Sequence, residues 1–296
     1  MAILLSQLFT GLSVGSILLL IALGLTFTFG QMNVINMAHG EFIMAGAYTS
    51  YVLQNTMGES LAGPSLLASL VVAFVVAGTM GLILEVVLIR HLYGRPLDTL
   101  LVTWGVSLML QQVARDIFGA PNVQTTAPAW LDGGLDIRGV TLPYARLFIM
   151  AVVVVAVVGI WVFLNRSSQG RRMRAVMQNR ELAGSSGIRT RAVDRRTFFI
   201  GSGLAGVAGV AVTLLGSVGP TLGTNYIVDA FLVVIVGGLG QLRGAILAAF
   251  SLGALNAFVE YYSHASAAKV VVFVAIVAFL QIRPQGMFVL RTRSLT

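Results

Sequence analysis

Long apolar runs alternate with short polar breaks along almost the whole chain. A helix needs about 20 apolar residues to cross the hydrocarbon core of a bilayer. Runs of about this length, some shorter, cover residues 5–29, 38–55, 64–89, 98–118, 144–165, 197–216, 226–239, 244–262 and 268–282. The pattern predicts an all-α polytopic membrane protein with about eight to ten transmembrane helices. We expect residues 1–296 to form a single transmembrane domain.

Two segments at the borders of apolar runs look irregular, because they are polar and contain or are bounded by glycine. They cover residues 30–41 and 216–226. Interrupted helices are tolerated at membrane depth where they line a cavity, and paired interruptions in two halves indicate an inverted repeat with the binding region between them. We therefore predict two halves, starting near residues 5 and 197, that run in opposite directions. The chain has 33 glycines, and those within the apolar runs favour close helix packing over a pore-lining role.

Positive charge is unevenly distributed. Nine of the nineteen Lys and Arg residues lie between Arg166 and Arg196, and none precedes Arg90. Positive residues concentrate in cytoplasmic loops, so we place residues 166–196 in the cytoplasm. Counting outward puts fifteen positive residues inside and four outside, with the N-terminus outside and the C-terminus cytoplasmic. In a chain that is 57% hydrophobic and 10% charged, the net charge of +8 indicates membrane topology and not nucleic-acid binding.

The basic segment 166–196 has the signals of a short helix. Asn179 can cap a helix start, Glu181 suits its first turn, and Gly187 can end it in a left-handed conformation. This segment is either a docking element for a cytoplasmic partner or a solvated loop that sets topology. Residues 119–143 form the longest outer loop, rich in Pro and Gly, which either docks an external partner or caps the bundle.

Four ionisable residues interrupt apolar runs and are functional candidates, because charge at membrane depth is costly. They are His39, Glu41, Glu85 and Asp229. Each has a structural alternative: Glu85 can pair with an arginine such as Arg90, His39 and Glu41 can contact the polar segment before them, and Asp229 can face the dipole of a helix start.

Several chemistries are excluded by what the sequence lacks. There is no cysteine, no paired-histidine metal motif and no nucleophile with plausible partners, so we expect no enzyme, metal or cofactor in this chain. Lys269 is the only lysine and lies in no phosphate-binding loop, so ATP and Mg would have to bind a partner subunit. The first apolar run is too long for a signal-peptide core and is expected to be a membrane helix.

Several motifs carry a family resemblance. Residues 181–187, ELAGSSG, resemble the EAA-x-x-x-G coupling helix of ABC importer permeases, with Leu182 replacing the middle Ala. Residues 21–30 and 34–42 resemble the N-terminal signature of the branched-chain amino acid permease family. Within the family, the chain is most similar to the urea permease branch. The motifs behind that comparison are residues 94–112, 118–123, 178–181, 226–231, 237–240 and 283–288.

The resemblance implies a bacterial inner-membrane ABC importer permease. The expected partners are a second permease subunit, two ATP-binding subunits, an extracytoplasmic binding protein and membrane lipid. In the coupling helix, the residues expected to transmit ATP-driven movement are Asn179, Glu181, Ala183 and Gly187.

Urea is the expected substrate, and an uncharged solute needs hydrogen-bonding groups along its path. From polarity and placement, the pathway candidates are Asn33, Asn36, His39, Glu41, Trp104, Ser107, Gln111, Gln112, Thr224, Asn225 and Asp229. The alternatives are an amino acid ABC permease and an ATP-independent channel or secondary transporter in which Glu41 and Asp229 relay protons.

Overall fold

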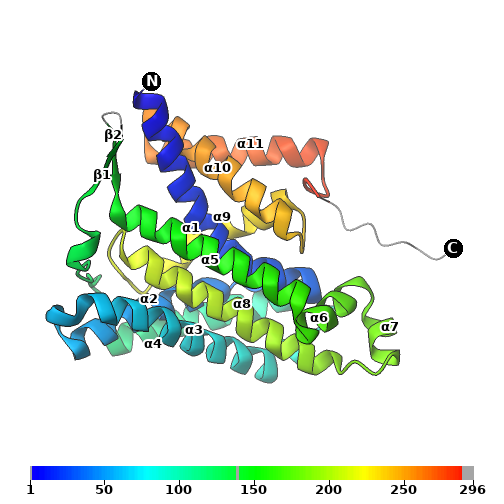
Figure 1. The fold of residues 1–296 in the computed structure, drawn as a ribbon. Coiled ribbons are helices and arrows are strands. Elements are labelled where there is room, and N and C mark those ends of the chain that lie inside the picture. Colours follow the sequence, from blue (N-terminus) through cyan, green and yellow to red (C-terminus); the bar gives the residue numbers. More distant parts are fainter. Residues whose placement is uncertain (1, 138–139, 289–296) are drawn as a thin grey trace.

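The computed structural model describes residues 2–137 and 140–288, which form a bundle of helices with one β-hairpin (Figure 1). The helices are α1 (Ala2–Met32), α2 (His39–Met57), α3 (Ala62–Val87), α4 (Pro96–Phe118), α5 (Tyr144–Arg166), α6 (Ser168–Gln178), α7 (Arg180–Ser185), α8 (Thr190–Thr213), α9 (Leu222–Gly237), α10 (Leu242–Tyr262) and α11 (Ala265–Ile282). The hairpin pairs β1 (Gly134–Ile137) with antiparallel β2 (Val140–Pro143).

Each of the nine apolar runs contains a helix. Five helices are long and apolar enough to cross a membrane: Ile3–Met32, Ala62–His91, Tyr144–Arg166, Thr190–Thr213 and Leu242–Tyr262. The helices α9 and α11 are apolar but shorter, whereas α2 and α4 contain more polar residues. The chain is therefore an all-α polytopic membrane protein, as predicted, although not every expected crossing is a full-length apolar helix.

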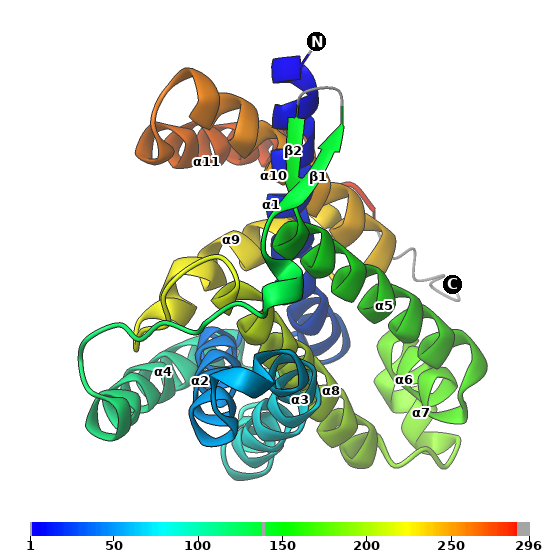
Figure 2. The ribbon, with the colours of Figure 1, turned by 60° about the vertical axis from the view of Figure 1, so that its left-hand side comes forward.

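The two halves of the bundle repeat the same packing. The order α1, α2, α3 in the first half corresponds to α8, α9, α10 in the second, and α1 packs on α10 as α3 packs on α8. The helices α1 and α8 are antiparallel, because Gln31 bonds Asp194 near one end while Gly24 meets Gly201 further along. The first helix of each half thus packs on the third helix of the other half, and the two first helices run in opposite directions. This arrangement is the expected inverted repeat. In Figure 2, α2, α3 and α4 form one group and α10 and α11 another, with α1 and α9 between them.

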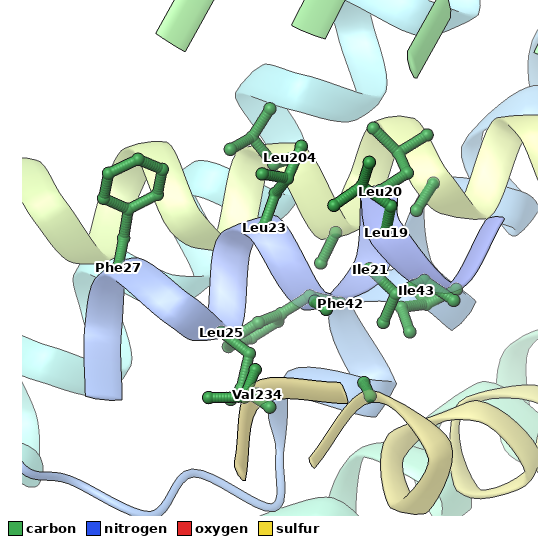
Figure 3. Close-up of a cluster of buried hydrophobic side chains, with 14 of the residues drawn as sticks. Leu19, Leu20, Ile21, Leu23, Leu25, Phe27, Phe42, Ile43, Leu204 and Val234 are labelled. Carbon is green, nitrogen blue, oxygen red and sulfur yellow. The ribbon is translucent and has the colours of Figure 1, made fainter. Parts of the chain in front are cut away.

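Close packing replaces hydrophobic burial as the main force between helices in lipid. Figure 3 shows part of this packing around α1, with side chains of neighbouring helices beside Leu19, Leu20, Ile21, Leu23 and Leu25. In one example, Phe42 of α2 lies near Leu25 of α1 and Val234 of α9. Phe42, Leu25 and Val234 are all buried. Where helices cross, glycine lets their backbones touch: a Cβ on Gly201 would lie 2.7 Å from the carbonyl oxygen of Gly24. Glycine is therefore required at these crossings for steric reasons.

The two ends of the bundle carry different structures. In Figure 1, α6 and α7 lie at one end, and the hairpin and the start of α1 lie at the other. The predicted outer loop, residues 119–143, contains a 3-10 turn at Ala129–Leu131 and both strands. At the other end, the predicted basic segment 166–196 contains α6 and α7 and runs into α8, which begins at Thr190.

Candidate functional site

The two interrupted segments bring the first turns of α2 and α9 together inside the bundle. A Cβ on Gly40 would lie 2.7 Å from the carbonyl oxygen of Gly223, so the backbones of α2 and α9 touch at their beginnings. His39, the first residue of α2, is completely buried and its Nε2 lies 3.3 Å from the carbonyl oxygen of Ile21, in the middle of α1. We call this meeting point the junction, formed by residues 36–41 and 222–224.

Glu41 is the centre of a buried hydrogen-bond cluster at the junction. Its Oε1 accepts hydrogen bonds from Ser107 Oγ at 2.8 Å and from Gln111 Nε2 at 2.9 Å, both on α4. Gln111 Nε2 also lies 3.1 Å from Thr224 Oγ1, on α9. The structural alternative for Glu41, contact with the polar segment before it, is wrong, because its partners lie on α4. One carboxylate thus holds α2 and α4 together beside the start of α9.

The helix α4 faces the junction with a polar stripe. Thr99, Thr103, Ser107 and Gln111 recur every four residues, which places them on one helix face, and all four are buried. Thr103 Oγ1 accepts a hydrogen bond of 3.0 Å from the backbone N–H of Met37. The stripe therefore satisfies part of the irregular backbone between α1 and α2. The pathway candidates chosen by polarity omit Thr103, although its four-residue spacing from Ser107 is a signal in the sequence.

Several polar atoms at the junction are buried without a hydrogen-bond partner among the described residues. They are both side-chain amide atoms of Asn36, Nδ1 of His39 and Oε2 of Glu41. An unpaired buried polar group costs about 1–3 kcal/mol, so native structures keep few of them without a functional reason. Their concentration at one place makes the junction the strongest candidate site.

A cavity of about 800 Å³ lies beside α9, where it is also bounded by α1, α10 and α11 and reaches Leu222 and Thr224 of the junction. Its polar wall includes Thr224, Asn225, Asp229, Asn256 and Lys269. Asp229 lies in the middle of α9, seven residues beyond its start, so the predicted interaction with the helix dipole is wrong. Asp229 instead shares this cavity with Lys269, the only lysine of the chain.

Three predicted pathway residues lie away from both the junction and the cavity. Trp104 is 53% exposed on the apolar face of α4. Gln112 is also exposed and bonds Asp116. Asn33 is exposed in a left-handed conformation, with φ of 52°, where α1 ends. Asn33 therefore serves the turn, because Asn tolerates this conformation better than most residues.

The short helix in the basic segment has the predicted local geometry. Asn179 caps α7, since its Oδ1 accepts a hydrogen bond of 3.0 Å from the N–H of Leu182. Gly187 has φ of 82° and ends the helix with a Schellman pattern, in which Ile188 N–H bonds the carbonyl of Ala183. Ala183 is buried, whereas Glu181 and Leu182 are exposed. The exposed face of α7 is thus available to another molecule.

Glu85 pairs with an arginine, as the structural alternative predicted, but with a different one. Its Oε2 lies 3.6 Å from Nε of Arg195, on α8, and its Oε1 accepts a hydrogen bond from Tyr93. The two charges come together because α3 and α8 pack against each other, which the sequence spacing did not reveal. Among residues 2–137 and 140–288, no group of three His, Asp or Glu side chains is arranged to hold a metal ion.

These features define a class of protein: a polytopic membrane protein built as an inverted repeat, with interrupted helices that meet around buried polar groups. Residues 7–280 match the family described as branched-chain amino acid transport system / permease component, and the chain belongs to that family. It is therefore a permease subunit of an ABC importer.

Individual relatives agree over nearly the full length. The chain is 31% identical over 292 residues to the high-affinity branched-chain amino acid transport system permease protein BraD of Pseudomonas aeruginosa, covering 95% of this chain and 94% of the relative. It is 30% identical over 290 residues to LivH of Escherichia coli K12, a permease protein of the same description, with the same coverage. The probable LivH of Methanocaldococcus jannaschii is 30% identical over 284 residues, covering 92% of this chain and 88% of the relative. No solved structure matches the chain.

Proposed function

We propose that the junction is this chain's share of a solute pathway driven by ATP hydrolysis on partner subunits. The observation that carries the proposal is the set of unpartnered buried polar atoms on Asn36, His39 and Glu41. A passing solute can exchange hydrogen bonds with such atoms, which lowers the cost of moving a polar molecule through apolar surroundings. The start of α9 closes the other side of the junction, so movement of α2 against α9 would open or close the path.

The complete importer contains other subunits in this proposal. They are a second permease, two ATP-binding subunits that hold ATP and Mg, and an extracytoplasmic binding protein. Residues 166–196 face the cytoplasm, with the N-terminus outside the bacterial inner membrane, and the exposed face of α7 contacts an ATP-binding subunit. Residues 1–296 act as one permease domain, and this subunit holds no cofactor of its own.

Branched-chain amino acids are the first substrate candidate. Relatives that match over nearly the full length carry that description. The cavity beside α9 adds a chemical reason, since Asp229 and Lys269 offer one negative and one positive group to the ammonium and carboxylate of a zwitterion. Apolar side chains such as Val14, Leu232 and Phe273 line the same cavity and suit a branched aliphatic side chain.

Urea is the second candidate, supported by the permease-branch motifs and by the chemistry of the junction. Urea is uncharged and needs both donors and acceptors. Asn36 offers both through its amide, and Ser107 and Gln111 supply further polar groups beside Glu41. If urea is the substrate, the Asp229–Lys269 pair is not needed for transport.

A single reconstitution separates the candidates. The complete importer in liposomes is tested for ATP-dependent uptake of labelled leucine and labelled urea, first as the wild type and then with Lys269→Met. If the substrate is a branched-chain amino acid, leucine is accumulated and Lys269→Met raises its KM. If the substrate is urea, urea is accumulated and the variant transports normally.

The same liposomes test the proposal as a whole. Uptake of either solute by this chain alone, without ATP, would favour the channel or secondary transporter and would overturn the ATP-driven pathway. Arg115→Gln serves as the control for the loss of positive charge in Lys269→Met, because Arg115 is exposed on α4 and does not line the cavity.

A further inference from the structure

Arg180, the first residue of α7, is joined to α8 by an ion pair that is buried only on the α8 side. Its guanidinium donates to both carboxylate oxygens of Asp194, with Nη1 lying 3.1 Å from Oδ1. The Asp194 side chain is completely buried in α8, whereas Arg180 is partly exposed. Its hydrogen bond to Asp194 raises the pKa of Arg180, so the guanidinium stays charged. The pair is bidentate, which fixes the orientation of Arg180 as well as its position.

The same carboxylate is bonded to the end of α1. Gln31 Nε2 donates to Oδ1 of Asp194 at 2.9 Å, and Gln31 Oε1 accepts from Thr197 Oγ1 at 2.6 Å. Gln31 lies in the last turn of α1, two residues before the left-handed turn at Asn33. That turn starts the segment that leads to Asn36 and the junction. A displacement of Arg180 is therefore coupled, through one carboxylate, to the segment that carries the candidate site.

A second branch leads from Arg180 to α3. The guanidinium carbon lies 5.0 Å from the centre of the Tyr93 ring, and the Tyr93 hydroxyl donates to Glu85 Oε1 at 2.8 Å. Burial raises the pKa of Tyr93, so its hydroxyl keeps the proton that this hydrogen bond needs. These contacts connect α1, α3, α7 and α8. We call the residues that make them the Arg180 network: Arg180, Asp194, Gln31, Thr197, Tyr93 and Glu85.

A gain in stability does not by itself account for this arrangement. Removing the Asp194 carboxylate from water costs energy that its attraction to Arg180 repays only with good geometry, and apolar replacements of buried ion pairs are often as stable. The best-attested benefit of a buried polar pair is that it fixes one register between helices. Fixed register is also what a mechanical connection requires, since the exposed α7 can move the end of α1 only through rigid contacts.

We propose that the Arg180 network transmits movement of α7 to residues 33–38 and so couples nucleotide binding to the opening of the junction. Arg180, Asp194 and Gln31 are positioning residues in this proposal, because none of them has to touch the solute or the nucleotide. The inference rests on the proposed function, namely import driven by partner ATPases.

The test measures ATP hydrolysis and uptake in the same proteoliposomes of the complete importer. Arg180→Gln and Gln31→Leu are each expected to lower uptake per ATP hydrolysed by about tenfold, within the range of coupling between protein sites. Arg180→Lys keeps the charge without the bidentate geometry and should rescue uptake only in part. Arg115→Gln, at an exposed arginine on α4 outside residues 166–196, should leave the ratio unchanged. ATP hydrolysis in the network variants should stay close to that of the wild type.

A conformational readout separates coupling from a merely structural role. The chain has no cysteine, so Ile35→Cys, which lies in the segment 33–38 but outside the left-handed turn at Asn33, gives one site for a thiol reagent when the partners are cysteine-free. Trapping the nucleotide state with vanadate should change the labelling rate of the introduced thiol, and Arg180→Gln should abolish that change. Equal loss of hydrolysis and uptake, or a vanadate effect that survives in Arg180→Gln, would overturn the inference. ATP-independent uptake by the wild type would instead overturn the proposed function.

Discussion

The two halves of the bundle share one architecture but treat their interrupted helices differently. In the first half, α4 lies over the start of α2 and bonds Glu41 through Ser107 and Gln111. In the second half, α11 occupies the corresponding place after α10, but a cavity of about 800 Å³ remains beside α9 and Asp229. The inverted repeat therefore sets where the helices meet. We call the first half closed, because α4 bonds Glu41 at the start of α2, and the second half open, because the cavity borders α9 at Asp229.

This difference assigns separate tasks to the halves. The closed half concentrates buried polar groups whose loss must disturb packing. The open half carries its charges on a cavity wall, where a substitution leaves packing largely intact. Substitutions should therefore have their largest effects where the two halves touch and in the closed half, and their smallest effects on stability in the open half.

The largest effect of a substitution is expected where the starts of α2 and α9 touch, since this contact belongs to both halves. Gly223→Ala adds a Cβ that would overlap the backbone of Gly40. Because backbone atoms cannot rotate away, we expect a loss near the upper end of the roughly 1–3 kcal/mol typical of overpacking, together with loss of uptake. Thermal unfolding and uptake assays measure both. Gly216→Ala is the matched control, since a Cβ there meets nothing within 4 Å, and equal tolerance of the two variants would contradict the close contact.

The closed half should depend on the Glu41 carboxylate. Glu41→Ala leaves Ser107 and Gln111 without their shared acceptor, at a cost of about 2 kcal/mol for buried unpaired groups. Glu41→Gln keeps an oxygen at this position and should recover much of the stability. Thermal unfolding of both variants checks this, with Glu260→Gln on the exposed end of α10 as the control. If Glu41→Ala is as stable as the wild type, α4 is held in place by other contacts.

Local signals account for the parts of the site that could be predicted. The cap at Asn179 and the helix end at Gly187 depend on neighbouring residues, and both are confirmed. The two polar breaks indicated where helices would be interrupted, because clustered glycine and polar residues are costly inside a continuous membrane helix and tolerated where a broken helix lines a cavity. What the breaks did not reveal is that the first turns of α2 and α9 would touch, since Gly40 and Gly223 are far apart in the sequence.

The errors have equally specific causes. Trp104 and Gln112 are pathway candidates together with Ser107 and Gln111 when residues are selected by polarity or size. However, Trp104 and Gln112 each lie one residue after a member of the buried stripe, so they point about 100° away from it. Counting every fourth residue from Thr99 selects the buried stripe and leaves out Trp104 and Gln112. The pairings of Arg195 with Glu85 and of Arg180 with Asp194 depend on how helices pack, so no local pattern predicts them.

Among residues 2–137 and 140–288, one side-chain hydrogen bond links the two halves at the junction, and its loss should have a smaller effect. Thr224→Val removes the hydroxyl that lies 3.1 Å from Gln111 Nε2 while keeping the side-chain shape. We expect a loss of about 0.5–1 kcal/mol, since this contact is only partly buried. A double-mutant cycle with Gln111→Leu measures the coupling directly. Additive effects of the two substitutions would mean that the halves do not communicate through this bond.

The smallest effect on stability is expected in the open half, and it provides the sharpest contrast with Glu41. Asp229→Asn changes a charge on the cavity wall and removes no hydrogen bond found among the described residues, so the free energy of unfolding should change by about 0.5 kcal/mol or less. Transport can nevertheless change, because the same carboxylate would face the ammonium group of an amino acid substrate. We therefore expect normal thermal unfolding together with a raised KM for leucine, whereas uptake of urea would be unchanged. A large loss of stability would instead make Asp229 part of the packed core, and the difference between a closed and an open half would disappear.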